Sequence, residues 1–149
     1  IGFAEKGVAL LPNIPVAVGI LAGVLVAAGQ PEEALPLIQS VKRFSPVTPA
    51  ILIFLEGRAY HTLGRYEEAI AAFERARARN PKGVPPVAFL ALTYADMGQM
   101  EEARAMAQKV IEVSPGFSAK GFANAVMIYK DRTKSERNIA NMLKAGLPE

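Results

Sequence analysis

The sequence carries one six-residue motif, Gly-x-x-Glu-Glu-Ala, three times at an almost constant interval. The motif begins at Gly29, Gly64 and Gly98, so its copies are 35 and 34 residues apart. Prolines keep the same interval, and they stand at Pro12, Pro46, Pro81 and Pro115. A period of about 20 to 50 residues is typical of chains that repeat one small structural unit. Such a chain folds as an array in which each unit contacts only its neighbours.

Each repeat is predicted to be a pair of antiparallel helices. The glycine ends the first helix because it adopts the left-handed backbone conformation at little cost. The two glutamates then lie in the first turn of the second helix, where the helix dipole favours negative charge. Apolar residues recur at helical spacing up to the proline, which cannot continue the helix. The expected fold is therefore all-α, a solenoid in which each hairpin hides its apolar stripe against the next.

The repeat resembles the tetratricopeptide repeat, whose pattern is W-x2-L-G-x2-Y, then A-x3-F, then P. In the middle repeat the matching residues are Gly57, Tyr60, Ala69, Phe73 and Pro81. The departures are Ile53 in place of Trp, Glu56 in place of Leu, and Ala107 in place of the large aromatic residue in the third repeat. The resemblance implies a right-handed superhelix that binds other proteins and has no active site of its own.

The register of the repeats divides the chain into five segments. Residues 1–14 are predicted to be the second helix of a preceding repeat, so the array is expected to extend upstream of Ile1. Three repeats follow, at residues 15–48, 49–83 and 84–117. Residues 118–149 are predicted to be capping helices. In the last helix we expect Thr133 to Glu136 to form a capping box and Gly146 to end the helix.

The C-terminal segment carries a second resemblance. Tyr129-Lys130-Asp131, a short helix, and then residues 144–149 look like the end of certain bacterial proteins. Those proteins join a class III adenylate/guanylate cyclase domain, or a DNA-binding regulator domain, to a C-terminal array of these repeats. The resemblance implies that Glu149 is at or near the natural C-terminus. It also implies a regulatory or self-association role within a larger protein.

Composition excludes several kinds of site. The chain has no cysteine, so disulfides and thiolate metal sites are excluded, and a reducing, cytoplasmic location is expected. The net charge of +3 comes from basic residues that are spread among acidic ones, so we expect no nucleic-acid binding. The apolar run from Val8 to Gly29 is interrupted by Pro12 and Pro15, and the remainder is shorter than the roughly 20 residues of a membrane span.

We expect no catalytic residue, no metal ligand set and no cofactor. Adjacent glutamates, such as Glu67 and Glu68, point about 100° apart on a helix and do not converge. His61 is the single histidine, and it has no cysteine or second histidine to complete a metal site. No phosphate-binding loop pattern occurs in the sequence.

The expected function is binding of a protein segment, extended or helical, in a groove that the first helices line. The predicted groove residues are Val16, Gly19, Gly23, Val26, Phe54, Arg58, His61, Thr62, Ala88, Leu92, Asp96, Phe122 and Tyr129. In family members that clamp the C-terminal carboxylate of chaperones, lysine and asparagine occupy the places of Gly19 and Gly23. We therefore expect no such clamp. The alternative is self-association, in which the apolar face pairs two copies as a homodimer.

Overall fold

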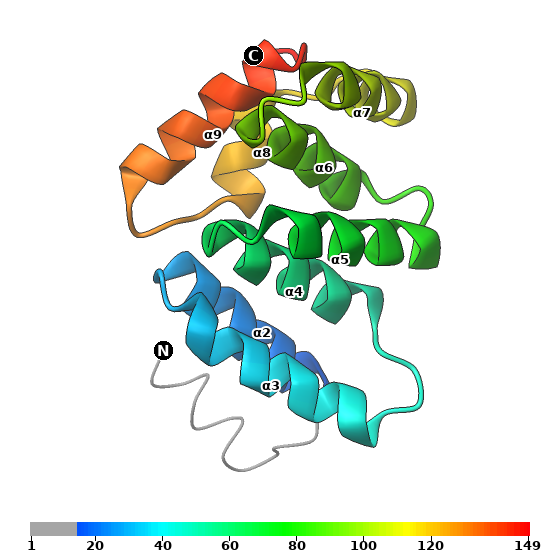
Figure 1. Cartoon of the computed structure of the whole chain (residues 1–149), viewed down its shortest axis with the longest axis vertical. Coiled ribbons are helices and arrows are strands. Elements are labelled where there is room, and N and C mark those ends of the chain that lie inside the picture. Colours follow the sequence, from blue (N-terminus) through cyan, green and yellow to red (C-terminus); the bar gives the residue numbers. More distant parts are fainter. Residues whose placement is uncertain (1–14) are drawn as a thin grey trace.

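The computed structural model describes residues 15–149, which form eight α-helices and no β-strand within that range (Figure 1). The helices are α2 (Pro15–Ala27), α3 (Pro31–Phe44), α4 (Ala50–Thr62), α5 (Tyr66–Arg79), α6 (Val84–Asp96), α7 (Met100–Val113), α8 (Ala119–Val126) and α9 (Arg132–Lys144). The predicted all-α fold is confirmed. The helix predicted within residues 1–14 lies outside the described residues. Among the described helices, none has both the length and the hydropathy needed to cross a bilayer.

The helices pair and stack as the repeat predicts. The hairpins are α2 with α3, α4 with α5, and α6 with α7, and they lie one above another along the long axis of the molecule (Figure 1). Between hairpins, α3 packs on α4 and α5 packs on α6, while the first helices α2 and α4 also touch. The apolar stripes therefore form one continuous core through the stack.

The recurring glycines make the turns within the hairpins. Gly29, Gly64 and Gly98 have φ angles of 81°, 74° and 76°, the left-handed region predicted for them. After Gly64, the Arg65 N–H donates to the Tyr60 carbonyl at 2.9 Å, which satisfies a terminal carbonyl of α4. Equivalent bonds follow the other two glycines. Each glutamate pair lies in the first turn of α3, α5 or α7, and each of these helices ends before its proline.

Aromatic packing joins the middle repeat to the third. The rings of Phe54, Phe73 and Phe89 contact one another with centroids 5.3–5.8 Å apart, and all three are buried. Gly57 lies directly against Phe73, because a Cβ atom at this glycine would come within 2.6 Å of the ring. The glycine of the family pattern is thus required here by close helix packing.

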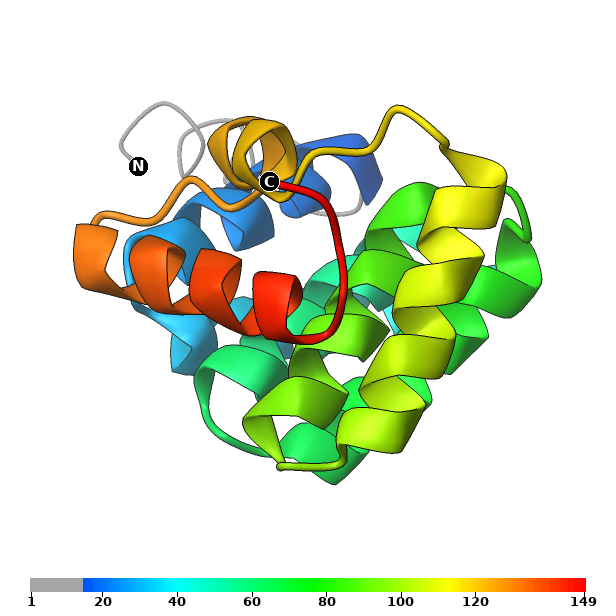
Figure 2. The same ribbon diagram turned by 90° about the horizontal axis from the view of Figure 1, so that it is seen from above.

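The C-terminal segment, residues 118–149, folds back along the face that the first helices form. Helix α9 packs on α6 and on α8. The Lys130 N–H donates to the Ala27 carbonyl at the end of α2, at 2.8 Å. The last residues then return to the start of α8, where the Ala119 N–H donates to the Pro148 carbonyl (Figure 2). The segment therefore touches both the first and the third hairpin.

The start and end of α9 test two of the sequence predictions. Asp131 caps this helix by accepting a hydrogen bond from the Thr133 N–H at 3.0 Å, and the helix begins at Arg132. The capping box predicted at Thr133 is therefore wrong, because an aspartate two residues earlier already satisfies the exposed N–H group. Gly146 follows the helix with a φ of 100°, as expected for a residue that ends it.

Candidate protein-binding groove

An open apolar cavity of about 800 Å³ lies between α2, α4 and α8. We call it the α2–α4–α8 groove. Its lining residues are Pro15, Val16, Gly19, Ile20, Gly23, Val24, Ala27, Ile51, Leu55, Arg58, Ala125, Val126 and Ile128. Arg58 is the one charged residue among them. The two glycines of α2 face α4, where a Cβ atom would lie 3.4 Å from Leu52 at Gly19 and 3.7 Å from Leu55 at Gly23.

Exposed apolar side chains are concentrated around this groove. Four of its lining residues are 56–70% exposed: Val16, Ile20, Ile51 and Ile128. Exposed apolar side chains are common on protein surfaces, but they are usually scattered singly rather than gathered at one place. Four of the eight large apolar residues that are exposed in the described part of the chain line this one cavity. Contiguous apolar surface of this kind is typical of interaction sites.

The predicted groove residues of α2, α4 and α6 separate into three groups in the structure. Val16, Gly19, Gly23 and Arg58 line the α2–α4–α8 groove. The residues that are buried and do not line this groove are Val26, Phe54, His61, Ala88 and Leu92, together with the side chain of Asp96. Thr62 is half-buried, and its hydroxyl donates to the Arg58 carbonyl at 2.9 Å.

The two predicted groove residues from the C-terminal segment belong to the part that covers the face. The Phe122 ring packs edge-on against Phe89, with centroids 6.0 Å apart. Tyr129 is buried, and its ring centroid lies 5.5 Å from the Arg58 guanidinium carbon. The C-terminal segment thus contacts the first helices of the second and third repeats, and the open part of the face is the half next to α2.

A buried polar group ties the covering segment to the array. His61 Nε2 on α4 lies 2.6 Å from Asp96 Oδ2 on α6. The Asn141 side chain on α9 donates to the other oxygen of Asp96. The side chains of His61 and Asp96 are 3% and 5% exposed, and neither residue lines a cavity described here. Their contacts therefore join three helices.

Sequence reasoning missed the wall that α8 provides. Ala125, Val126 and Ile128 line the groove, and nothing in the repeat pattern places a residue after Phe117 against α2. Ile20 and Ile51 were also missed. Their signal was weak because α2 is apolar on every side, so periodicity does not separate its buried face from its exposed one.

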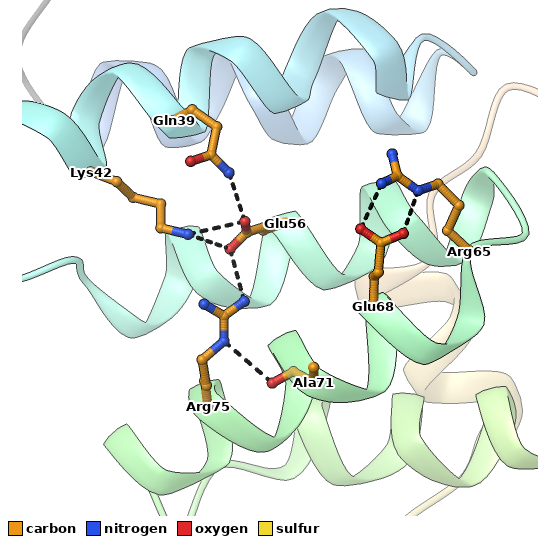
Figure 3. Close-up of polar contacts among 7 residues, drawn as sticks. All are labelled: Gln39, Lys42, Glu56, Arg65, Glu68, Ala71 and Arg75. Carbon is orange, nitrogen blue, oxygen red and sulfur yellow. Dashed lines mark hydrogen bonds and ion pairs between the residues drawn. The ribbon is translucent and has the colours of Figure 1, made fainter.

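The glutamates of the repeat motif make local structural contacts. Arg65, just before α5, binds Glu68 through Nε and Nη2 at 2.6 and 2.5 Å (Figure 3). At the start of α3, Gln30 donates to Glu33 at 2.8 Å in the same relative position. Both contacts are exposed, and each links the residue before a helix to its first turn. Within residues 15–149, no three histidine or acidic side chains gather in a way that suits a metal ion.

Glu56 is a buried carboxylate that the family pattern does not contain. It is 2% exposed and lies between the first and second hairpins. Gln39 donates to its Oε1 at 2.9 Å, and the Lys42 ammonium lies 3.0 and 3.1 Å from its two oxygens (Figure 3). Arg75 from α5 reaches Oε2 at 3.5 Å. This carboxylate therefore connects helices of two repeats.

Comparison with solved structures shows the same fold in other proteins. A crystal structure of MamA superposes with a TM-score of 0.68 at 22% identity, over 95% of this chain and 82% of that one. A crystal structure of PilW, a widely conserved type IV pilus biogenesis factor, superposes with a TM-score of 0.72 at 18% identity. That match covers 95% of this chain and 64% of PilW. Identities this low show the fold alone.

Comparison of the sequence with protein families agrees with the geometry. No curated protein sequence matches the chain significantly. Two family models, both described as tetratricopeptide repeat, match residues 21–84 and residues 60–120. The two matches overlap and together span most of the chain, including all three motif copies. The chain is therefore a tetratricopeptide repeat protein over residues 21–120.

Proposed function

We propose that this chain is a non-catalytic scaffold that binds a segment of another protein in the α2–α4–α8 groove. The observation that carries the proposal is the cluster of exposed Val16, Ile20, Ile51 and Ile128 around one cavity. Burying an aliphatic side chain of this size contributes up to about 1.5–3 kcal/mol. A segment that covers several of them gains enough to offset part of the entropy lost on association.

The shape of the groove favours a protein segment over a compact small molecule. The cavity opens along α2, and its walls come from helices of the first and second repeats and from the C-terminal segment. Gly19 and Gly23 line the cavity, and the places of their missing side chains face Leu52 and Leu55 of α4. Both an extended segment and a helical segment fit a groove of this shape.

A peptide selection tests the proposal. Random peptides displayed on phage would be selected against the full chain, and the enriched peptides would be synthesised and their affinities measured by calorimetry. We expect Ile20→Asp to abolish binding, because a carboxylate would then face the apolar groove. Val47→Asp is the matched control: Val47 is 58% exposed like Ile20 but does not line the groove. Equal binding to both variants, or no enriched peptide, would contradict the proposal.

Self-association is the competing use of the same surface. If two copies paired through the groove, light scattering would show a mass that rises with concentration and falls back to the monomer value on Ile20→Asp. The predicted groove residue Val26 does not suit this experiment, because it is fully buried and a charge there would disrupt the core. A concentration-independent monomer would exclude the homodimer and leave the binding proposal standing.

The regulatory role in a larger bacterial protein rests on the resemblance of the C-terminal residues. Tyr129 and Lys130 contact α4 and α2, Leu147 is buried, and the Pro148 carbonyl accepts from Ala119. The residues that carry the resemblance therefore pack the C-terminal segment onto the repeats. A cyclase or regulator domain upstream of Ile1 would be established by the full reading frame.

A further inference from the structure

Arg58 is a buried cation whose hydrogen-bonding capacity is unused. The residue is 6% exposed, and its Nε and Nη2 atoms are buried without a hydrogen-bond partner. None of the ion pairs in residues 15–149 includes it. A buried charge without a partner is costly, and proteins normally pair such groups or satisfy them with hydrogen bonds.

Two aromatic rings lie close to the Arg58 guanidinium, but neither ring offers its N–H groups an oxygen acceptor. Its carbon lies 5.6 Å from the Phe89 ring centroid and 5.5 Å from that of Tyr129. Cation–π contacts of this kind contribute about 0.5–2 kcal/mol, and they leave the N–H groups without an oxygen acceptor. The carboxylate of Asp96, which contacts α4 through His61, is already used by His61 and Asn141. The protein therefore holds Arg58 in place without neutralising it.

The position of Arg58 connects this unused charge to the groove. Arg58 lines the α2–α4–α8 groove, where every other lining residue is apolar or glycine. An apolar segment alone would bury the cation still further and leave it unpaired. An occupant with one carboxylate at this point would supply an acceptor. The Nε and Nη2 atoms are closed to solvent in this structure, so the guanidinium would turn toward the groove to bind the carboxylate through two parallel N–H···O bonds.

We infer that the groove recognises a protein segment in which an aspartate or glutamate side chain stands among apolar residues. The apolar side chains cover the exposed valine and isoleucines, and the carboxylate pairs with Arg58. This inference rests on the proposed function and names the chemistry of the partner. It places the specificity of the groove in one residue of the second repeat.

The test changes the peptide rather than the protein. Each peptide enriched in the selection would be resynthesised with its acidic residue as the amide, Asp to Asn or Glu to Gln, and measured on the wild-type chain. We expect enriched peptides to contain an acidic residue between apolar ones, and the amide versions to bind at least about tenfold more weakly. Because the protein is unchanged, a loss of affinity cannot come from misfolding.

A variant of Arg58 tests whether the acidic residue of the peptide binds at this position. On Arg58→Gln, whose fold would be checked by circular dichroism, the acidic and amide peptides should bind equally. Enriched peptides without an acid, or amide versions that bind as tightly as the acids, would overturn the inference while the proposed function stood. The absence of any enriched peptide would contradict both. Decanoate, an aliphatic carboxylate, serves as the competitor: displacement of the peptide at equal concentration would show a site for free acids and overturn the inference.

Discussion

Replacing Glu56 with glutamine would remove one negative charge at the junction between the first two repeats. The side chain keeps its size, and one oxygen remains to accept a hydrogen bond from Gln39 or Lys42. The change removes the ion pair with Lys42, whose ammonium lies 3.0 Å from Oε1, and the longer contact with Arg75 at 3.5 Å. The perturbation is therefore electrostatic and leaves the packing volume unchanged.

The structure sets the size of the effect. Hydrogen bonds to a charged group contribute about 1.5–3 kcal/mol net to the free energy of unfolding. Here the Lys42 side chain is 24% exposed and that of Arg75 is 52% exposed, so water can solvate both cations once the carboxylate is gone. We therefore expect Glu56→Gln to lower the free energy of unfolding by about 2 kcal/mol, near the lower end of that range. For a domain of this size the midpoint temperature should fall by about 4–8 °C.

Urea unfolding of the full chain, followed by far-UV circular dichroism, measures this effect. A double-mutant cycle with Lys42→Met isolates the ion pair, and we expect a coupling energy of about 1 kcal/mol between the two positions. A loss below about 0.5 kcal/mol for Glu56→Gln would refute the reasoning, since that is the size of an ordinary surface substitution. Additive single effects would show that the ion pair contributes nothing measurable.

Two further predictions follow from local geometry. Gly57→Ala should lower the free energy of unfolding by about 1–3 kcal/mol, because its Cβ would lie 2.6 Å from the buried Phe73 ring. Gly23→Ala is the control: its Cβ would make an ordinary van der Waals contact with Leu55 at 3.7 Å, and the gain in helix propensity should leave the urea midpoint unchanged or higher. Hydrogen bonds from the side chain and backbone of Thr133 lower the pKa of Asp131. Its contribution to stability is therefore present at neutral pH and lost as the pH falls through the lowered pKa, so Asp131→Asn should flatten the acid side of a plot of midpoint temperature against pH.

The hairpins could be predicted from the sequence because their signals are local. The φ angle at Gly64, the glutamates in the first turn of α5 and the helix end before Pro81 each depend on residues within one turn. The short period between markers fixed the register, and stacking then follows from the apolar stripes. The solenoid is therefore almost fully specified by features that a single sequence displays.

The part of the first-helix face that the C-terminal segment covers could not be predicted in the same way. Contacts such as the Lys130 N–H with the Ala27 carbonyl, or Asn141 with Asp96, join residues far apart in the sequence. No periodicity marks such pairs, so a single sequence does not show which part of the first-helix face the C-terminal segment contacts. Arg58 was predicted to line a groove and it lines a cavity in the structure, but its lack of a partner depends on what the C-terminal segment brings near it.

The central claim is that the C-terminal segment covers one half of the first-helix face and leaves the other half open. The chain has no cysteine, so single cysteine variants report exposure directly. Val16 is 70% exposed beside the groove, and Ala88 is fully buried on α6. In a thiol-labelling experiment, Val16→Cys should react near the rate of an unfolded peptide, and Ala88→Cys at least about a hundredfold more slowly. Equal rates at the two positions would contradict the account.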